Sequence, residues 1–134
     1  LTSQSGDLRG QEILPEHLAS VEQGDILLMT SCYEGLQQPW LSESTVKWLI
    51  EDRQIRMLGL QATGVQWQYA LKAEAPANSP IRRMLLGANV PIAHPLVNID
   101  TLQQGRVFYF GMPLRTPKME ASFIRAMALE APDA

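Results

Sequence analysis

The sequence predicts an α/β protein with a single domain over residues 1–134, and three observations lead to this prediction. A chain of 134 residues has room for one domain rather than two. It is 46% hydrophobic and 19% charged, which excludes intrinsic disorder and indicates a packed core. Two apolar runs of strand length, residues 26–30 (ILLMT) and 55–60 (IRMLGL), flank an amphipathic segment with helical spacing. That order is typical of a parallel strand pair with a crossover helix.

The first part of the chain predicts a short helix, a turn, a strand and a loop. Residues 13–18 favour a short helix, since Pro15 suits a first helical position where its missing N–H would be unpaired anyway. Residues 23–25 (QGD) indicate a turn before the strand at 26–30. Because that strand is apolar throughout, we expect it to be covered on both faces. Residues 32–40 indicate a loop.

The middle of the chain predicts the crossover helix, the second buried strand and a long loop. Ser42 is a good N-cap for a helix that continues to about Asp52, with apolar residues recurring on one face. Residues 55–60 then form the second buried strand. Residues 62–78 are polar and irregular, and a loop of this length indicates a functional or interface segment.

The remaining segments predict one more helix and three more strands, for a total of about five strands and three helices. Residues 79–86 begin with Ser-Pro and favour a helix that Gly87 ends. Residues 90–93 indicate a short strand, and because Pro91 lies within it and Pro95 follows it closely, we expect this strand at a sheet edge. Residues 106–112 (RVFYFGM) form a strongly aromatic strand, and residues 123–129 form the last strand.

Composition excludes several classes of function. The formal net charge is −3, and the 11 Lys and Arg residues cluster nowhere beyond Arg82-Arg83, so we expect no nucleic-acid partner. A single cysteine, Cys32, excludes an internal disulfide framework and a cysteine-based zinc site, and it fits a cytoplasmic protein. The apolar runs are too short to span a bilayer, so we expect no membrane partner. The first residue is Leu1 rather than Met, and residues 1–10 are polar and turn-like, so we expect either a processed or truncated chain or one with a sizeable N-terminal part that lies elsewhere.

No catalytic motif with fixed spacing is present, so single residues have to be weighed. We expect His17 to be a surface or helix-cap histidine. His94 follows an apolar strand, and ligands bind at the carboxyl ends of strands in α/β sheets. The alternative for His94 is a buried or interface histidine with satisfied hydrogen bonds. Cys32 also follows a strand, and we expect a buried, inert thiol there rather than a nucleophile.

Several segments follow, in order and spacing, the pattern of a known family. They are residues 24–30 (GDILLMT), 39–50 (PWLSESTVKWLI), 57–60 (MLGL), 82–91 (RRMLLGANVP), 96–102 (LVNIDTL), 112–114 (MPL) and 122–129 (SFIRAMAL). Together they resemble the cyclase family of metal-dependent hydrolases, which includes bacterial kynurenine formamidase and isatin hydrolase. The resemblance covers nearly the whole chain from about Leu14.

The resemblance implies a swivelling β/β/α fold in a homo-oligomer. It also implies hydrolysis of amide, ester or lactam bonds in small molecules, with a divalent metal, zinc or manganese, that activates water. Most metal ligands of the family come from an N-terminal His-x-Gly-Thr-His-x-Asp-x-Pro-x-His motif, which this chain does not contain. The chain therefore resembles the C-terminal portion of the family, an incomplete fold without the metal-motif part.

Four family-site positions depart from the family pattern. Gln61 and Gln66 fall where the family has aspartates, Arg82 falls on its histidine, and His94 falls on its glutamate. Each change removes a metal-compatible or ionisable group, and arginine cannot ligate a metal. We expect no metal in this chain alone, with His94 as a possible replacement ligand.

Two interpretations of the function remain open. In the first, the protein is a hydrolase of this family whose metal motif lies outside this chain, in its missing half or in a partner chain. In the second, it is a catalytically degenerate, metal-free relative with a structural or small-molecule-binding role. In that case Arg82 and His94 would frame a pocket for a small carboxylate, because the guanidinium fork holds a carboxylate with two hydrogen bonds.

Overall fold

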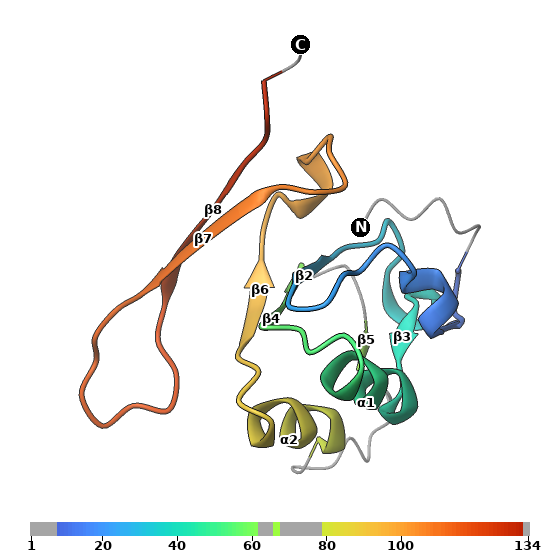
Figure 1. The fold of residues 1–134 in the computed structure, drawn as a ribbon, viewed down its shortest axis with the longest axis horizontal. Coiled ribbons are helices and arrows are strands. Elements are labelled where there is room, and N and C mark those ends of the chain that lie inside the picture. The colour runs from blue at the N-terminus through green and yellow to red at the C-terminus, as the bar shows by residue number, and fades with distance from the viewer. Residues whose placement is uncertain (1–7, 62–65, 68–78, 133–134) are drawn as a thin grey trace. The chain divides into compact units, whose positions relative to one another are not determined.

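The computed structural model describes residues 8–61, 66–67 and 79–132, and the contacts divide the chain into two compact units (Figure 1). Unit 1 is Leu1–Asp100 and unit 2 is Thr101–Ala134. The described residues form eight strands, two α-helices and three 3₁₀ helices, several of them only two or three residues long. This content confirms the predicted α/β class. That the whole chain is one domain, and that its topology is the swivelling one, stay predictions.

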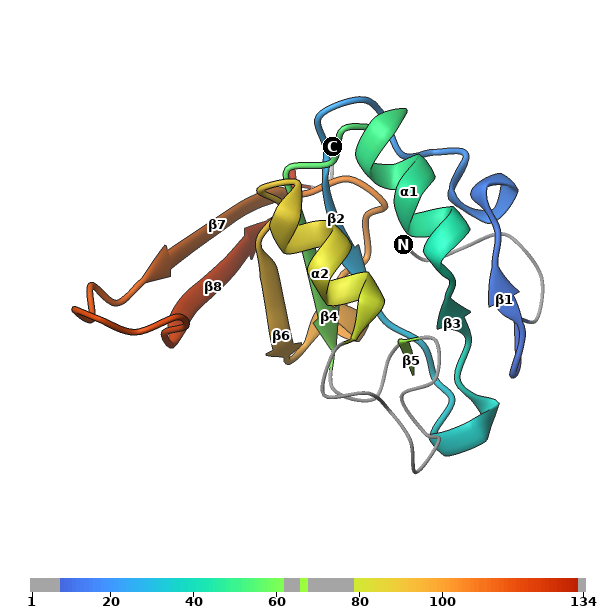
Figure 2. The ribbon, with the colours of Figure 1, turned by 90° about the horizontal axis from the view of Figure 1, so that it is seen from below.

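The main sheet of unit 1 is parallel and has three strands in the order β2-β4-β6. They are β2 (Ile26–Met29), β4 (Met57–Gln61) and β6 (Ile92–Leu96). The crossovers between them contain α1 (Glu43–Glu51) and α2 (Pro80–Gly87), which lie side by side in both views (Figures 1 and 2). The predicted parallel pair with its crossover helix is thus confirmed. The predicted strand at 90–93 lies at the sheet edge as expected, but it begins two residues later and continues to Leu96.

The central strand β4 is the one that is covered on both faces. Leu58 and Leu60 are fully buried, and Gly59 between them is buried as well. A Cβ at Gly59 would stand 2.6 Å from a methyl of Leu28 and 2.9 Å from one of Leu96, so these side chains close over the glycine. The expectation of two covered faces was wrong for β2. Leu27 and Met29 are buried on one face, whereas on the other face Ile26 is exposed and Leu28 is half-buried.

Both helices begin at the predicted serine caps. The Ser42 hydroxyl accepts a hydrogen bond from the Thr45 amide at 3.3 Å, and the Ser79 hydroxyl accepts one from the Arg82 amide at 3.5 Å. The helix after Ser79 includes Gly87 instead of ending before it, and the chain leaves the helix through Asn89. Asn89 has a φ of 60° and takes the left-handed conformation that glycine was expected to supply.

A second small sheet of unit 1 was not predicted. It pairs β1 (Glu12–Ile13), β3 (Trp40–Leu41) and β5 (Gln66–Trp67) in parallel. The helix expected over residues 13–18 is therefore shortened to the 3₁₀ helix η1 (Pro15–Leu18), because residues 12–13 pair with β3 instead. The loop at 32–40 contains η2 (Gly35–Gln37). Apart from β5, the predicted loop at 62–78 lies outside the described residues.

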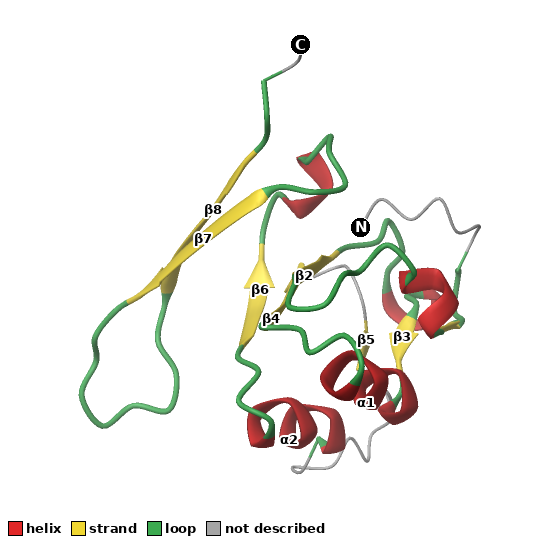
Figure 3. Cartoon of the chain, in the orientation of Figure 1, coloured by secondary structure: helices red, strands yellow, loops and turns green. Residues whose placement is uncertain are grey.

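Unit 2 is an antiparallel hairpin of β7 (Phe108–Pro113) and β8 (Ile124–Leu129), which confirms both predicted strands to within two residues (Figure 3). A short 3₁₀ helix, η3 (Ile99–Thr101), precedes it. The base of the hairpin is closed by Glu130, whose carboxylate accepts hydrogen bonds from the amides of Gln103 and Gln104 at 2.6 and 2.7 Å.

One buried hydrogen bond joins the small sheet to α1. The Thr45 hydroxyl, fully buried, donates to the Ile13 carbonyl at 2.7 Å. Thr45→Val keeps the side-chain shape but leaves that carbonyl buried without its donor, so we expect the free energy of unfolding to fall by about 1–3 kcal/mol. Urea denaturation of the two proteins measures the difference. Thr116→Val, the same change at an exposed position, should shift stability by less than about 0.5 kcal/mol. Equal stability of Thr45→Val and the unmodified chain would show that the bond is dispensable.

Candidate functional site

The four family-site positions all lie in unit 1, on four different elements. Gln61 ends β4, Gln66 begins β5, Arg82 lies in the first turn of α2, and His94 lies in the middle of β6. His94 was expected at the carboxyl end of its strand, and this is wrong by two residues. The edge position of β6 explains the difference, because an edge strand tolerates a proline such as Pro95 within it.

Arg82 and His94 are brought within electrostatic reach of each other, because α2 packs against β6. The pKa of His94 is lowered from its ordinary value of 6.5, first by partial burial of the ring and second by the positive charge of Arg82. Both effects disfavour a second positive charge on the imidazole. Arg82 and His94 are also both exposed residues, so solvent can reach the pair. These two are the sequence-predicted site residues that the structure places together.

The side chain of Gln61 makes a hydrogen bond to the backbone. Its side-chain oxygen accepts a hydrogen bond from the Asp100 amide at 3.1 Å and thereby holds the start of η3 to the end of β4. The glutamine side chain is longer than that of the aspartate in the family pattern and carries no charge, and its oxygen reaches the Asp100 amide. The side chain of Gln66 lies outside what the structure describes.

The described residues at this location do not fit a divalent metal ion. Zinc or manganese requires several neutral imidazole, thiolate or carboxylate ligands at one point. Among the residues that the structure describes, no three His, Cys, Asp or Glu side chains could share an ion. Arg82 also places a fixed positive charge near His94, which opposes a second cation there.

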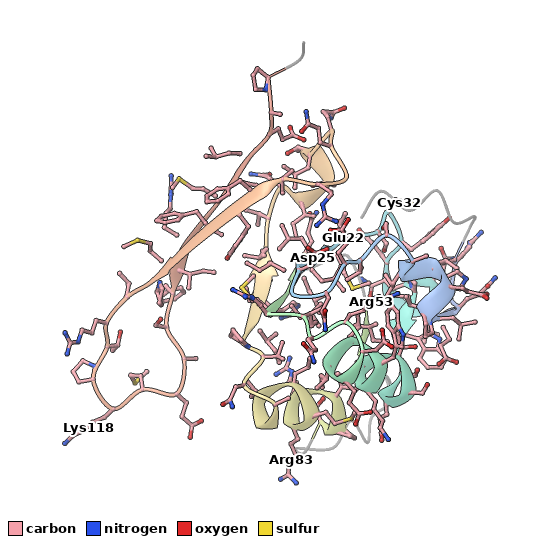
Figure 4. The ribbon with its side chains drawn as sticks, viewed as in Figure 1. Glu22, Asp25, Cys32, Arg53, Arg83 and Lys118 are labelled. Atoms are coloured by element: carbon pink, nitrogen blue, oxygen red, sulfur yellow. The ribbon has the colours of Figure 1, made fainter. Side chains whose placement is uncertain are left out.

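The same two residues suit an anion. The guanidinium of Arg82 presents planar N–H donors that match a carboxylate, and the imidazole of His94 can add a donor and, when protonated, a charge. Arg83 is the matched neighbour on α2, and Figure 4 shows its side chain extending away from the helix. Of these two arginines, Arg82 and not Arg83 contributes to the lowered pKa of His94, in addition to the partial burial of the ring.

The remaining candidates take structural or surface positions. The Nδ1 atom of His17 accepts a hydrogen bond from the Leu14 amide at 2.9 Å, which confirms the expected cap role. Cys32 is exposed, so the expectation of a buried thiol was wrong; the loop after β2 carries it to the surface. Thr30 was placed at the end of the predicted strand and within the family-like segment 24–30, but it was not singled out as a site residue. In the structure it follows β2 directly, and its hydroxyl is buried without a hydrogen-bond partner among the described residues.

Comparisons with known proteins find a likeness in fold. No family model matches the chain. No curated protein matches it either. Among solved structures, one described as a potential metal-dependent hydrolase with cyclase activity has a TM-score of 0.61 and 20% sequence identity. The match covers 95% of this chain and 60% of that chain, so the present chain spans about three-fifths of that structure's length.

Within the described residues, no helix has both the length and the hydropathy that a bilayer crossing requires.

The electrostatic link between Arg82 and His94 can be tested directly. Removing the charge in Arg82→Gln should raise the pKa of His94 toward its ordinary value, since one of the two causes of the lowering is gone. Nuclear magnetic resonance titration of the imidazole signals, assigned with a His17→Gln variant, measures this. Arg83→Gln removes a charge from the next residue and should shift the His94 pKa less. An equal shift in the two variants would mean that His94 senses net charge rather than Arg82.

Proposed function

We propose that this chain is a relative of the cyclase-like hydrolases that binds a small carboxylate at Arg82 and His94 and holds no metal centre of its own. The fold likeness to a potential metal-dependent hydrolase with cyclase activity supports the scaffold part of the proposal. The observation that carries the binding part is the packing of α2 against β6, which places the exposed Arg82 and His94, two family-site positions, within electrostatic reach of each other.

The binding chemistry follows from these two side chains. A carboxylate seated on the Arg82 guanidinium would make two charge-assisted hydrogen bonds. Its negative charge would offset the effect of Arg82 on His94 and favour the protonated imidazole. His94 would then donate a further hydrogen bond, and affinity should increase as the pH falls toward the pKa of His94.

A second candidate function is hydrolysis of amide, ester or lactam bonds with a metal motif that lies outside this chain. It is favoured by the length of the similar structure, two-fifths of which has no counterpart in the present chain. The missing ligands would come from an N-terminal half or a partner chain, in a homo-oligomer or a hetero-complex. His94 would then be an added metal ligand rather than an anion-binding group.

Calorimetric titration with benzoate and acetate tests the carboxylate site. We expect the unmodified chain to bind at least one of them, and Arg82→Gln to weaken binding at least tenfold, because hydrogen bonds to charged groups contribute about 1.5–3 kcal/mol each. Arg83→Gln is the matched control and should bind nearly as well as the unmodified chain. Absence of binding to the unmodified chain, or equal loss in both variants, would refute the site.

Elemental analysis of the purified chain tests whether the chain holds a metal centre of its own. The carboxylate-binding function predicts much less than one equivalent of zinc or manganese per chain, because the described residues at Arg82 and His94 do not fit a cation. One equivalent that survives purification and is lost in His94→Gln would instead support the hydrolase with a rebuilt metal site.

A further inference from the structure

The outer edge of β6 presents backbone hydrogen-bonding groups. β6 is the last strand in the order β2-β4-β6, and among the residues that the structure describes no strand pairs with its outer side. The Leu58 amide donates to the Pro91 carbonyl at 3.0 Å, and Leu58 stands opposite Ile92. In a parallel ladder this register turns the backbone groups of Ala93 toward β4. The N–H and C=O of Ile92 and the N–H of His94 therefore point to the outer side.

The side chains of Ile92 and His94 lie on the face of the sheet that α2 covers. Residues two apart in a strand carry their side chains on the same face. Ile92 packs against the buried cluster to which Ile81 and Leu85 of α2 belong. His94 shares this face, where it is exposed while Ile92 is half-buried. The edge of β6 thus carries one apolar and one polar side chain on the side of α2.

Two exposed residues of α2 accompany this edge. Arg82 and Leu86 are four residues apart, so they lie on the same side of the helix. α2 packs against β6, and the two elements lie together in Figure 2. Because the charge of Arg82 acts on His94, this side of α2 is turned toward β6. Leu86 is 58% exposed although its side chain is large and apolar. A cation and an apolar side chain therefore follow each other along α2.

We infer that the carboxylate bound at Arg82 and His94 is the C-terminus of a peptide that adds to the outer edge of β6 as a parallel strand. This inference rests on the proposed function. The direction follows from charge, since β6 runs from Ile92 toward His94 and Arg82 lies beside the later residue. A parallel peptide ends at this cation with its carboxylate, whereas an antiparallel peptide would bring its N-terminal ammonium there and be repelled.

The edge also indicates which peptides would bind. Hydrogen bonds to the outward backbone groups of Ile92 and His94 contribute affinity without regard to peptide sequence, and side chains at alternate positions provide selectivity. Those on the side of α2 would contact Leu86 and Ile92, which are both apolar. The ligand class is therefore an extended peptide with a free C-terminus and apolar residues at alternate positions.

Calorimetric titration of the full chain with three probes tests the inference. The probes are the pentapeptide acetyl-Val-Thr-Val-Thr-Val with a free carboxylate, the same peptide as its C-terminal amide, and N-acetylglycine as a carboxylate without a side chain. The free pentapeptide should bind at least tenfold more tightly than either of the others. A pentapeptide that binds no more tightly than N-acetylglycine would overturn the inference and leave the carboxylate site intact. Absence of binding by all three probes would refute the carboxylate site as well.

A variant of α2 tests the apolar contact separately from the charge. Leu86→Gln should weaken binding of the free pentapeptide at least threefold and leave N-acetylglycine binding unchanged, because the exposed leucine would contact only the longer ligand. Leu36→Gln is the matched control, since Leu36 is an exposed leucine of unit 1 in η2. Equal binding of the pentapeptide to these two variants would contradict the proposed position of the peptide.

Hydrogen exchange locates the added strand. At saturation with the free pentapeptide, the amides of Ile92 and His94 should exchange at least tenfold more slowly, because both would donate to peptide carbonyls. N-acetylglycine should leave the Ile92 amide unchanged. Nuclear magnetic resonance of the labelled chain measures both rates. A bound pentapeptide that protects neither amide would show that the peptide does not extend the sheet at β6, and the inference would be wrong.

Discussion

Unit 1 depends on the burial of β4 between two parallel neighbours. Leu58 and Leu60 are fully buried on this strand, and Gly59 allows Leu28 and Leu96 to close over it from the flanking strands. A larger residue at Gly59 would have to displace both leucines. Because β4 is covered on both faces, its neighbours and the crossover helices are fixed to it, and every described position of the candidate site is set relative to this strand.

The strands and helices packed around β4 determine which side chains lie near each other at the candidate site. The α2 crossover returns the chain to β6 and brings Arg82 near His94, although the two are twelve residues apart in sequence. The end of β4 brings Gln61 to the Asp100 amide, where it stabilises a turn instead of providing a charged ligand. At these positions the fold therefore presents one fixed cation, one titratable imidazole and one neutral amide that hydrogen-bonds a backbone amide.

The sequence predicted those strands and helix starts that depend on residues close to one another in the chain. The parallel pair was predictable because residues 26–30 and 55–60 are mostly apolar and of strand length. Both helix starts were predictable because Ser42 and Ser79 are strong caps. The small sheet β1-β3-β5 was not, since two-residue strands leave no periodicity and their pairing depends on distant segments. The family resemblance marked Arg82 and His94 as site positions, and their joint role as a site stays a prediction. The exposed mid-strand position of His94 depends on the edge location of β6.

The central claim is that Arg82 and His94 act together on an anion, and proton linkage tests it most directly. Benzoate titration near pH 6.5, the ordinary pKa of histidine, in two buffers with different ionisation enthalpies measures the protons taken up on binding. The account predicts proton uptake that disappears in His94→Gln, because a bound carboxylate favours the protonated imidazole. Binding without proton uptake, or uptake that persists in His94→Gln, would contradict it.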